Sequence, residues 1–274
     1  MEPLPYEERG YLREPFRLFH LADDRHTEVP YHYHTFHKII LLLAGRADYA
    51  IEGERYTLLP GDYVLVGRGS IHRPIVASGD FYERAILYIS PEYLQKLSCP
   101  GSDLERCFLG AQEDFRYVYH AGGGDGVRQL FMQLEQSRQE GGFGAELLCQ
   151  SLFVQLMVEV NRLSLAGNAA SAAEGDSKII AILQYLNAHL TEGLTIDDLA
   201  ARFYISKYHM MRRFRDETGY TIHGYITEKR LLLARQLLDQ GLPLGEAALR
   251  CGYQEYSTFS RAYKKQFGHS PSKL

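Results

Sequence analysis

Residues 246–271 read EAALRCGYQEYSTFSRAYKKQFGHSP, and they hold the second copy of a pattern that occurs twice near the C-terminus. The segment RRFR at 212–215, followed by Gly219, recurs 49 residues later as RAYK at 261–264, followed by Gly268. Each copy predicts a short helix, a tight turn and a second helix with basic residues beside an aromatic one. A helix-turn-helix of this kind places its second helix in the DNA major groove. Two of them in tandem indicate DNA as the leading partner.

The helical period separates two faces on each second helix. Phe259, Tyr263 and Phe267 are spaced four residues apart, and Met210 with Phe214 repeats this spacing, so we expect these side chains to pack inward. The other face then carries the residues that could meet DNA: Tyr208, Met211, Arg212, Arg215, Ser257, Ser260, Arg261 and Lys264. Arginine and serine side chains can hydrogen-bond to base edges. Arg215 and Lys264 are instead expected to contact phosphates. The alternative is a solvated basic face, which two copies in one phase disfavour.

The residues between the two copies predict a rigid connector. Residues 225–240 (YITEKRLLLARQLLDQ) are rich in helix formers, and Gly241 and Pro243 follow as stop signals. A helix over 222–240 would be about 28 Å long at about 1.5 Å per residue. Successive major-groove faces on one side of B-DNA are about 34 Å apart. A connector of this length could present both recognition helices to adjacent turns of one duplex.

Residues 178–274 resemble the DNA-binding domain of AraC/XylS-type transcription regulators, through ARQLL at 234–238, EAA at 246–248, TFSRAYK at 258–264 and GHSP at 268–271. The resemblance implies base reading by Tyr208, Met211 and Arg212 in the first copy, and by Tyr256, Ser257, Ser260 and Arg261 in the second. It also implies an activator that recruits RNA polymerase.

The first turn departs from the family pattern. Tyr204 occupies the turn position at which Gly252 stands in the second copy. We therefore expect the first turn to be less tight.

Charge divides the chain into two parts. Residues 177–274 contain 14 Lys and Arg against 9 Asp and Glu, whereas residues 1–176 contain 16 against 25. Only the second part is therefore expected to meet nucleic acid. The small, polar segment 164–177 predicts a flexible linker between a domain at 1–163 and a DNA-binding domain at 178–274.

Composition indicates an ordinary soluble protein. No apolar run approaches 18 residues, and the acidic N-terminus has no signal segment, so we expect a cytoplasmic protein with no membrane contact. The four cysteines form no CxxC pair and are expected to be reduced, buried thiols.

The first domain opens with short β-rich runs. They lie at 38–44, 47–51, 55–59, 63–66 and 84–89, with turn residues between several of them, and they predict a small jelly-roll barrel. The whole chain is thus expected to be of the α+β class.

This domain resembles a cupin. His32, His34 and His72 stand at the spacing of the cupin motifs, and in metal-binding cupins the matching positions are three His and one Glu. Lys38 takes the place of that Glu. An ammonium beside three imidazoles opposes a cation, so we expect no metal and no cofactor. The alternatives are a divalent metal site and histidines that only stabilise the barrel. His37 could serve as a ligand only if a bulge turned it inward.

The barrel predicts a site for a small effector. The candidate residues are His32, His34, Lys38, His72, Arg73, Glu83 and Arg84. Regulators of the AraC type with such a domain often sense sugars, so the resemblance implies a polar metabolite, with a sugar as one candidate.

Two apolar helices are expected after the barrel, at 127–140 and 143–165. Helices in this position commonly dimerise such regulators, and packing on the barrel alone is the alternative. The function we predict is that of a ligand-responsive, DNA-binding transcription regulator. The competing class is a metal-dependent cupin enzyme with an appended DNA-binding domain.

Overall fold

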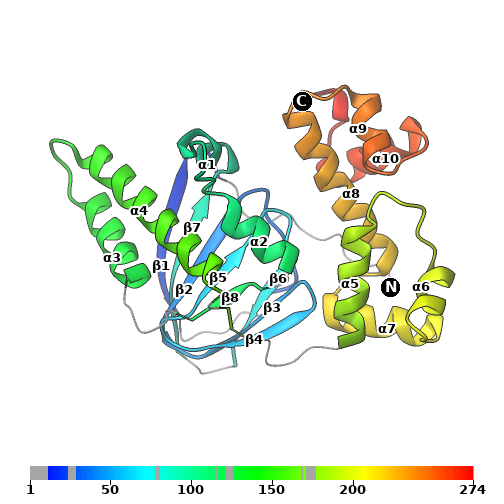
Figure 1. Cartoon of the computed structure of the whole chain (residues 1–274), viewed down its shortest axis with the longest axis horizontal. Helices are drawn as coiled ribbons and strands as arrows, with labels where there is room; N and C mark the ends of the chain where they lie inside the picture. Colours follow the sequence, from blue (N-terminus) through cyan, green and yellow to red (C-terminus); the bar gives the residue numbers. More distant parts are fainter. Residues whose placement is uncertain are drawn as a thin grey trace. The chain divides into compact units, whose positions relative to one another are not determined.

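The computed structural model describes residues 12–23, 29–77, 81–114, 116–120, 126–167, 169–170 and 177–273. The chain divides into two compact units, Met1–Glu174 and Gly175–Leu274 (Figure 1). No helix of the described part is long and apolar enough to cross a membrane.

The first unit is built on two antiparallel sheets. The larger has the order β1-β7-β2-β5-β8, and the smaller has the order β4-β3-β6. The strands are β1 (Phe16–Asp23), β2 (His37–Gly45), β3 (Ala47–Ile51), β4 (Glu54–Leu58), β5 (Tyr63–Val66), β6 (His72–Ile75), β7 (Tyr82–Ile89) and β8 (Val118–Tyr119). The five expected strands are confirmed within about two residues, whereas β1, β6 and β8 were not anticipated. This sheet-rich, cupin-like domain bears out the α+β expectation.

Strand alternation gives the central strand β2 two different faces. Its residues are almost all buried, so both faces lie against protein. Lys38 pairs with Tyr88, and Leu42 pairs with Arg84, so these side chains share one face of the larger sheet. His37 lies on the other face, where its ring stacks on Phe108 at 4.3 Å between centroids.

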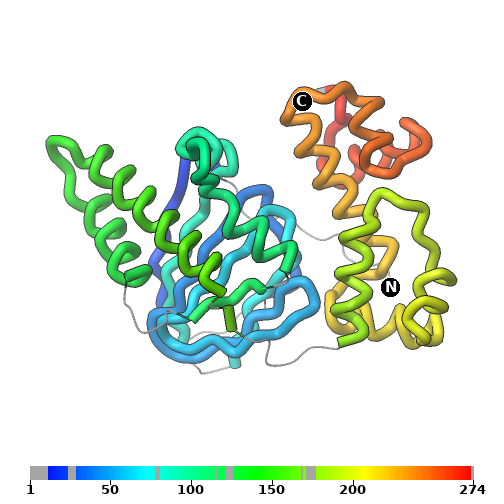
Figure 2. Tube along the Cα trace, viewed as in Figure 1, coloured from blue at the N-terminus to red at the C-terminus, as the bar shows by residue number. Residues whose placement is uncertain are grey.

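Four helices accompany the sheets: α1 (Pro91–Leu97), α2 (Arg106–Asp114), α3 (Gly126–Gln139) and α4 (Ala145–Leu165). The last two confirm the expected helical pair, and they form an antiparallel hairpin that is visible in green in Figure 2. Phe153 and Leu156 of α4 are completely buried. Asn161 joins α4 to α2, because its side chain accepts from the Cys107 amide at 2.9 Å and donates to the Leu104 carbonyl at 3.0 Å.

The second unit is all helical. It consists of α5 (Ser177–Ala188), α6 (Ile196–Arg202), α7 (Lys207–Thr218), α8 (Ile222–Asp239), α9 (Leu244–Arg250), α10 (Tyr256–Phe267) and the 3₁₀ turn η1 (Pro271–Lys273). The expected connector is α8, which ends one residue earlier than predicted. Thr221 caps its first turn by accepting a hydrogen bond from the Gly224 amide.

The predicted linker needs one correction at its start. Helix α4 continues through Leu165 and ends at the cap residue Ala166, so residues 164–165 are helical. The Ala170 amide then donates to the Val118 carbonyl of β8 at 2.8 Å, which ties this stretch to the sheet. Residues 168 and 171–176 of the predicted linker lie outside the described residues.

The four cysteines differ in their burial, contrary to the expectation that all are buried. All four are free, and Cys107 and Cys251 are buried as expected, but Cys149 is half-buried and Cys99 is exposed.

Candidate DNA-binding surface and effector site

Helices α6 and α7 form the first helix-turn-helix. Ser206 caps α7 by accepting a hydrogen bond from the His209 amide. Met210 and Phe214 are completely buried, as the sequence pattern predicted. Their burial turns the opposite face of α7 to solvent, so that Tyr208 is 73% exposed and Met211 43% exposed. Arg212 and Arg215 are exposed on the same helix.

Helices α9 and α10 repeat this arrangement. Phe259 and Tyr263 are completely buried, and both pack into the core under α8. The residues turned outward are Tyr256, Ser257, Arg261 and Lys264, all exposed, and Ser260, half-buried. The Arg261 side chain folds back along the helix and donates to the Ser257 carbonyl at 3.3 Å. This bond is a long one and would have to break for the guanidinium to reach a base edge.

The two turns have the same backbone geometry, contrary to the expectation of a looser first turn. Tyr204 has a φ of 50° and Gly252 a φ of 81°, both in the left-handed region. The amide after each also bonds back to the preceding helix, from Ile205 to Ala200 and from Tyr253 to Ala248. The fold thus imposes one conformation on both turns, and Tyr204 adopts it despite the steric cost of its Cβ.

Arg230 of α8 joins the two halves of this unit, and the sequence pattern gave no sign of it. Its guanidinium donates to the carbonyls of Leu190 at 2.7 Å, Glu192 at 2.5 Å and Gly252 at 3.1 Å. The first two lie in the loop before α6, and the third lies in the turn of the second helix-turn-helix. One side chain on the connector therefore fixes the loop of one half against the turn of the other.

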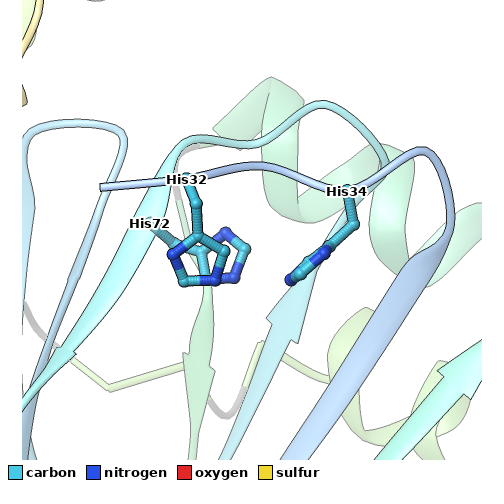
Figure 3. A group of neighbouring side chains, drawn as sticks. All are labelled: His32, His34 and His72. Carbon is cyan, nitrogen blue, oxygen red and sulfur yellow. The ribbon is translucent and has the colours of Figure 1, made fainter. Parts of the chain in front are cut away.

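The three histidines of the first unit come together, as the resemblance to the cupin motifs implied. His32, His34 and His72 are buried, and their ring centroids lie 4.4–5.0 Å apart. Figure 3 shows His32 and His34 extending from one stretch of chain toward the same side, with His72 beside His32. A bridge between the backbones of His32 and His72 holds the two stretches together, with hydrogen bonds of 3.1 and 3.0 Å.

Lys38 lies near this cluster, and its charge contributes to a lowered pKa of His72, after the larger effect of burial. Burial, and secondarily the neighbouring charge of Arg84, lower the pKa of Lys38 to about 7. The expectation of a metal-free site assumed a permanently charged ammonium. Because this lowered pKa brings the neutral amine within reach near pH 7, the charge of Lys38 does not by itself exclude a cation.

Arg84 and Tyr88 share the sheet face of Lys38. The Lys38 Nζ lies 5.8 Å from the centre of the Tyr88 ring, and Arg84 forms an ion pair of 2.6 Å with Asp23. Tyr49 of the smaller sheet stacks on His72, and its buried hydroxyl has no hydrogen-bond partner among the described residues. Buried polar groups of both sheets thus surround the histidines.

Two of the expected effector residues lie elsewhere. Glu83 is next to Arg84 on β7 and so faces the opposite side, where it bonds His20 at 2.9 Å. Arg73 follows His72 on β6, and its guanidinium lies over the Tyr31 ring at 4.4 Å. Alternation along the strand therefore separates both residues from the histidine cluster.

His37 is not a further ligand of the cluster. Its Nε2 bonds Glu105 at 2.9 Å, and its Nδ1 accepts from the Arg68 amide at 3.2 Å. Burial lowers the pKa of His37 despite the carboxylate. Both of its ring nitrogens are engaged on the helix side of the sheet, so the bulge needed to turn it inward does not occur.

Comparison with protein families gives two matches. An AraC-like ligand binding domain matches residues 17–157, and a helix-turn-helix domain matches residues 199–274. Together they define a ligand-responsive, DNA-binding transcription regulator and not an enzyme. The chain belongs to the AraC family of regulators.

Individual relatives and solved structures are similar to this chain at low sequence identity. The HTH-type transcriptional activator RhaS of Escherichia coli (strain SMS-3-5 / SECEC) is 27% identical over 256 residues, which cover 89% of this chain and 86% of RhaS. The C-terminal domain of AraT, a response regulator from Geobacillus stearothermophilus, is 30% identical, with a TM-score of 0.35 over 36% of this chain and 83% of that one. ToxT from Vibrio cholerae O395 is 14% identical, with a TM-score of 0.39 over 94% of this chain and 96% of that one. These TM-scores are too low to show a shared fold.

Proposed function

We propose that this regulator reads DNA through the outward faces of α7 and α10. The observation that carries the proposal is the repeated geometry of the two helices: Met210 and Phe214 of α7 are buried in phase with Phe259 and Tyr263 of α10. Basic residues are exposed in phase on the opposite faces. Helix α8 has 18 residues and is about 27 Å long at about 1.5 Å per residue. That length is compatible with recognition helices on successive major-groove faces, about 34 Å apart.

The expected base readers are Tyr208, Met211, Arg212, Tyr256, Ser257, Ser260 and Arg261, and the expected phosphate contacts are Arg215 and Lys264. Arg212 forms a long ion pair of 3.8 Å with Asp216, and both side chains are 66% exposed. An interaction this exposed is weak and would give way to a guanine edge.

The test is a mobility-shift assay on the native promoter and on scrambled DNA. Arg212→Ala and Arg261→Ala should each weaken specific binding by about 1–3 kcal/mol and relax preference at one base position. Arg106→Ala, on α2 of the other unit, is the control, because it removes an equal charge from an exposed ion pair with Glu113. Equal loss on both DNAs would contradict base reading by Arg261.

We place the effector at the interior polar cluster of the first unit, around His32, His34, Lys38, His72 and Arg84. Amine, guanidinium, imidazole and phenol groups there could hydrogen-bond a hydroxyl-rich or anionic molecule, so a sugar is a reasonable first class to screen. Arg73 and Glu83 face away from this cluster and are not part of the proposed site. A thermal-shift screen with sugars and sugar acids should give a stabilising compound, and Lys38→Met should remove that stabilisation while DNA binding stays intact.

We propose that the regulator is a homodimer joined through the connection between α3 and α4 and the first turn of α4. Phe143 is fully exposed, and Leu147 and Leu148 are 72% and 51% exposed. Exposed apolar groups this close together are typical of an interaction surface. Sedimentation of the full chain should show a dimer that Leu147→Glu dissociates. Leu59→Glu, at another exposed leucine, is the matched control, and a wild-type monomer at tens of micromolar would contradict the dimer.

The similarity to RhaS, which is named a transcriptional activator, supports an activating role. The regulator would then act in the cytoplasm by recruiting RNA polymerase. In vitro transcription with purified polymerase tests this step directly. Higher transcript yield on addition of the protein supports activation, and a lower yield indicates repression.

A further inference from the structure

Three buried histidines converge from two separate stretches of the first unit. Their ligating nitrogens all lie within 4.8 Å of one another. In a tetrahedral site with metal–nitrogen bonds of about 2.0–2.1 Å, the ligand nitrogens are about 3.4 Å apart. Side-chain rotations that shorten the distances by about 1 Å would bring all three into the range of one ion.

The hydrogen bonds of two of these rings fix their tautomers. The Nδ1 of His32 lies 2.9 Å from the Pro30 carbonyl, and the Nδ1 of His72 lies 2.9 Å from the Ser70 carbonyl. A carbonyl oxygen can only accept, so each Nδ1 carries the proton and each neutral ring keeps its lone pair on Nε2. Metal-ligating histidines usually donate their other ring N–H to a backbone carbonyl or carboxylate in this way.

His72 also carries a sign that the cluster receives a ligand. Its Nε2 is completely buried and has no hydrogen-bond partner among the described residues. Buried polar atoms are usually satisfied, and one that is not calls for a further partner. A structural role alone would leave this acceptor unpaired inside the protein.

We propose that His32, His34 and His72 bind one divalent transition-metal ion inside the ligand-sensing domain. Imidazole ligands suit zinc, nickel, cobalt and copper. Three protein ligands leave at least one coordination position open, which an oxygen atom of the small effector can occupy. The inference deepens the proposed effector site, but it rests on the histidine geometry and not on the charge of Lys38.

The test is direct metal binding by the full chain, without a histidine tag and after treatment with a chelator. Titration calorimetry with zinc, nickel and cobalt chlorides should show one equivalent per chain. His72→Gln and His32→Gln should each lower the affinity at least about tenfold. His223→Gln, at an exposed histidine of α8, is the control and should bind as the wild type does.

A second measurement uses only the wild-type protein, so it does not depend on the variants folding. X-ray absorption of the zinc-loaded chain should show about three imidazole nitrogens at about 2.0–2.1 Å. The inference is overturned by an absence of binding, by fewer than two imidazoles at the ion, or by equal loss of affinity in His223→Gln. Its failure would leave the regulator intact, because specific DNA binding is measured separately in the mobility-shift assay.

Discussion

The two turns of the DNA-binding unit offer a pair of substitutions with opposite expected effects. Gly252→Ala places a Cβ at a φ of 81°, and that atom would lie 2.5 Å from the Thr191 carbonyl oxygen and 2.9 Å from the Thr191 Cα. Both neighbours are backbone atoms, which cannot rotate away. Tyr204→Gly instead removes a Cβ from a φ of 50°, and the Tyr204 side chain is 91% exposed, so little packing is lost.

The magnitudes follow from these geometries. The left-handed conformation costs about 1–2 kcal/mol for a residue with a Cβ, and forced overpacking adds about 1–3 kcal/mol. Alanine also lowers the conformational entropy of the unfolded chain, which offsets about 0.4–1 kcal/mol of this destabilisation. Gly252→Ala should therefore destabilise the unit by about 1–4.6 kcal/mol. Tyr204→Gly removes the backbone strain, but glycine raises the conformational entropy of the unfolded chain, which opposes this gain. The net effect should be a stabilisation of about 0–1.5 kcal/mol.

Urea unfolding of the full chain, followed by far-UV circular dichroism, measures both changes. Gly245→Ala is the control in the second copy. An added Cβ there meets nothing within 4 Å, so alanine should stabilise α9 by up to about 1 kcal/mol. Tyr204→Ala is the control in the first copy, because it removes the ring and keeps the strain. Wild-type stability in Gly252→Ala would refute the reasoning.

Four further predictions concern single side chains. Arg230→Met should destabilise the second unit by about 1.5–4.5 kcal/mol, since three carbonyl bonds are lost at about 0.5–1.5 kcal/mol each; an unchanged urea midpoint would contradict this. Hydrogen bonds that His20 donates to Glu83, and secondarily to Glu135, raise the pKa of His20 above 6.5. Its contribution should be complete below pH 6.5 and lost as pH rises through the raised value, so His20→Gln should destabilise more at pH 5.5 than at pH 8.5. Lys264→Ala should weaken binding to all DNA sequences alike and reduce the salt slope by about one unit, as measured by titration at two or more salt concentrations. Lys38→Glu should tighten zinc binding at least about tenfold, because it adds an anionic ligand beside the histidines; weaker binding in calorimetry would place residue 38 away from the ion.

The sequence alone determined the two-helix pattern, because helical periodicity depends only on local spacing. Met210 and Phe214 are buried where the four-residue spacing put them, and α8 ends where Gly241 and Pro243 follow. The central strands were predictable for the same reason. Strand β6 contains a proline and half-buried positions, and β8 has only two residues. Neither shows the alternation of apolar and polar residues from which a strand could be predicted.

The histidine motif shows where local spacing stops being sufficient. The resemblance to the cupin motifs implied that His32, His34 and His72 lie together, and they do meet. Which of the charged neighbours join them was decided by the register of β7 against β2, which turns Arg84 toward Lys38 and Glu83 away. The lowered pKa of Lys38 could not be predicted from the sequence either, because it comes from burial by strands that are far apart in the chain.

Arg230 and Tyr204 depend on tertiary structure in the same way. The three carbonyls that Arg230 binds come from segments 22 to 40 residues distant, so no local pattern marks it. The left-handed backbone of Tyr204 is imposed by helix packing on both sides of the turn, against the preference of the residue itself. Periodicity along the chain thus determined which faces are buried, whereas register and long-range contact decided which polar groups meet.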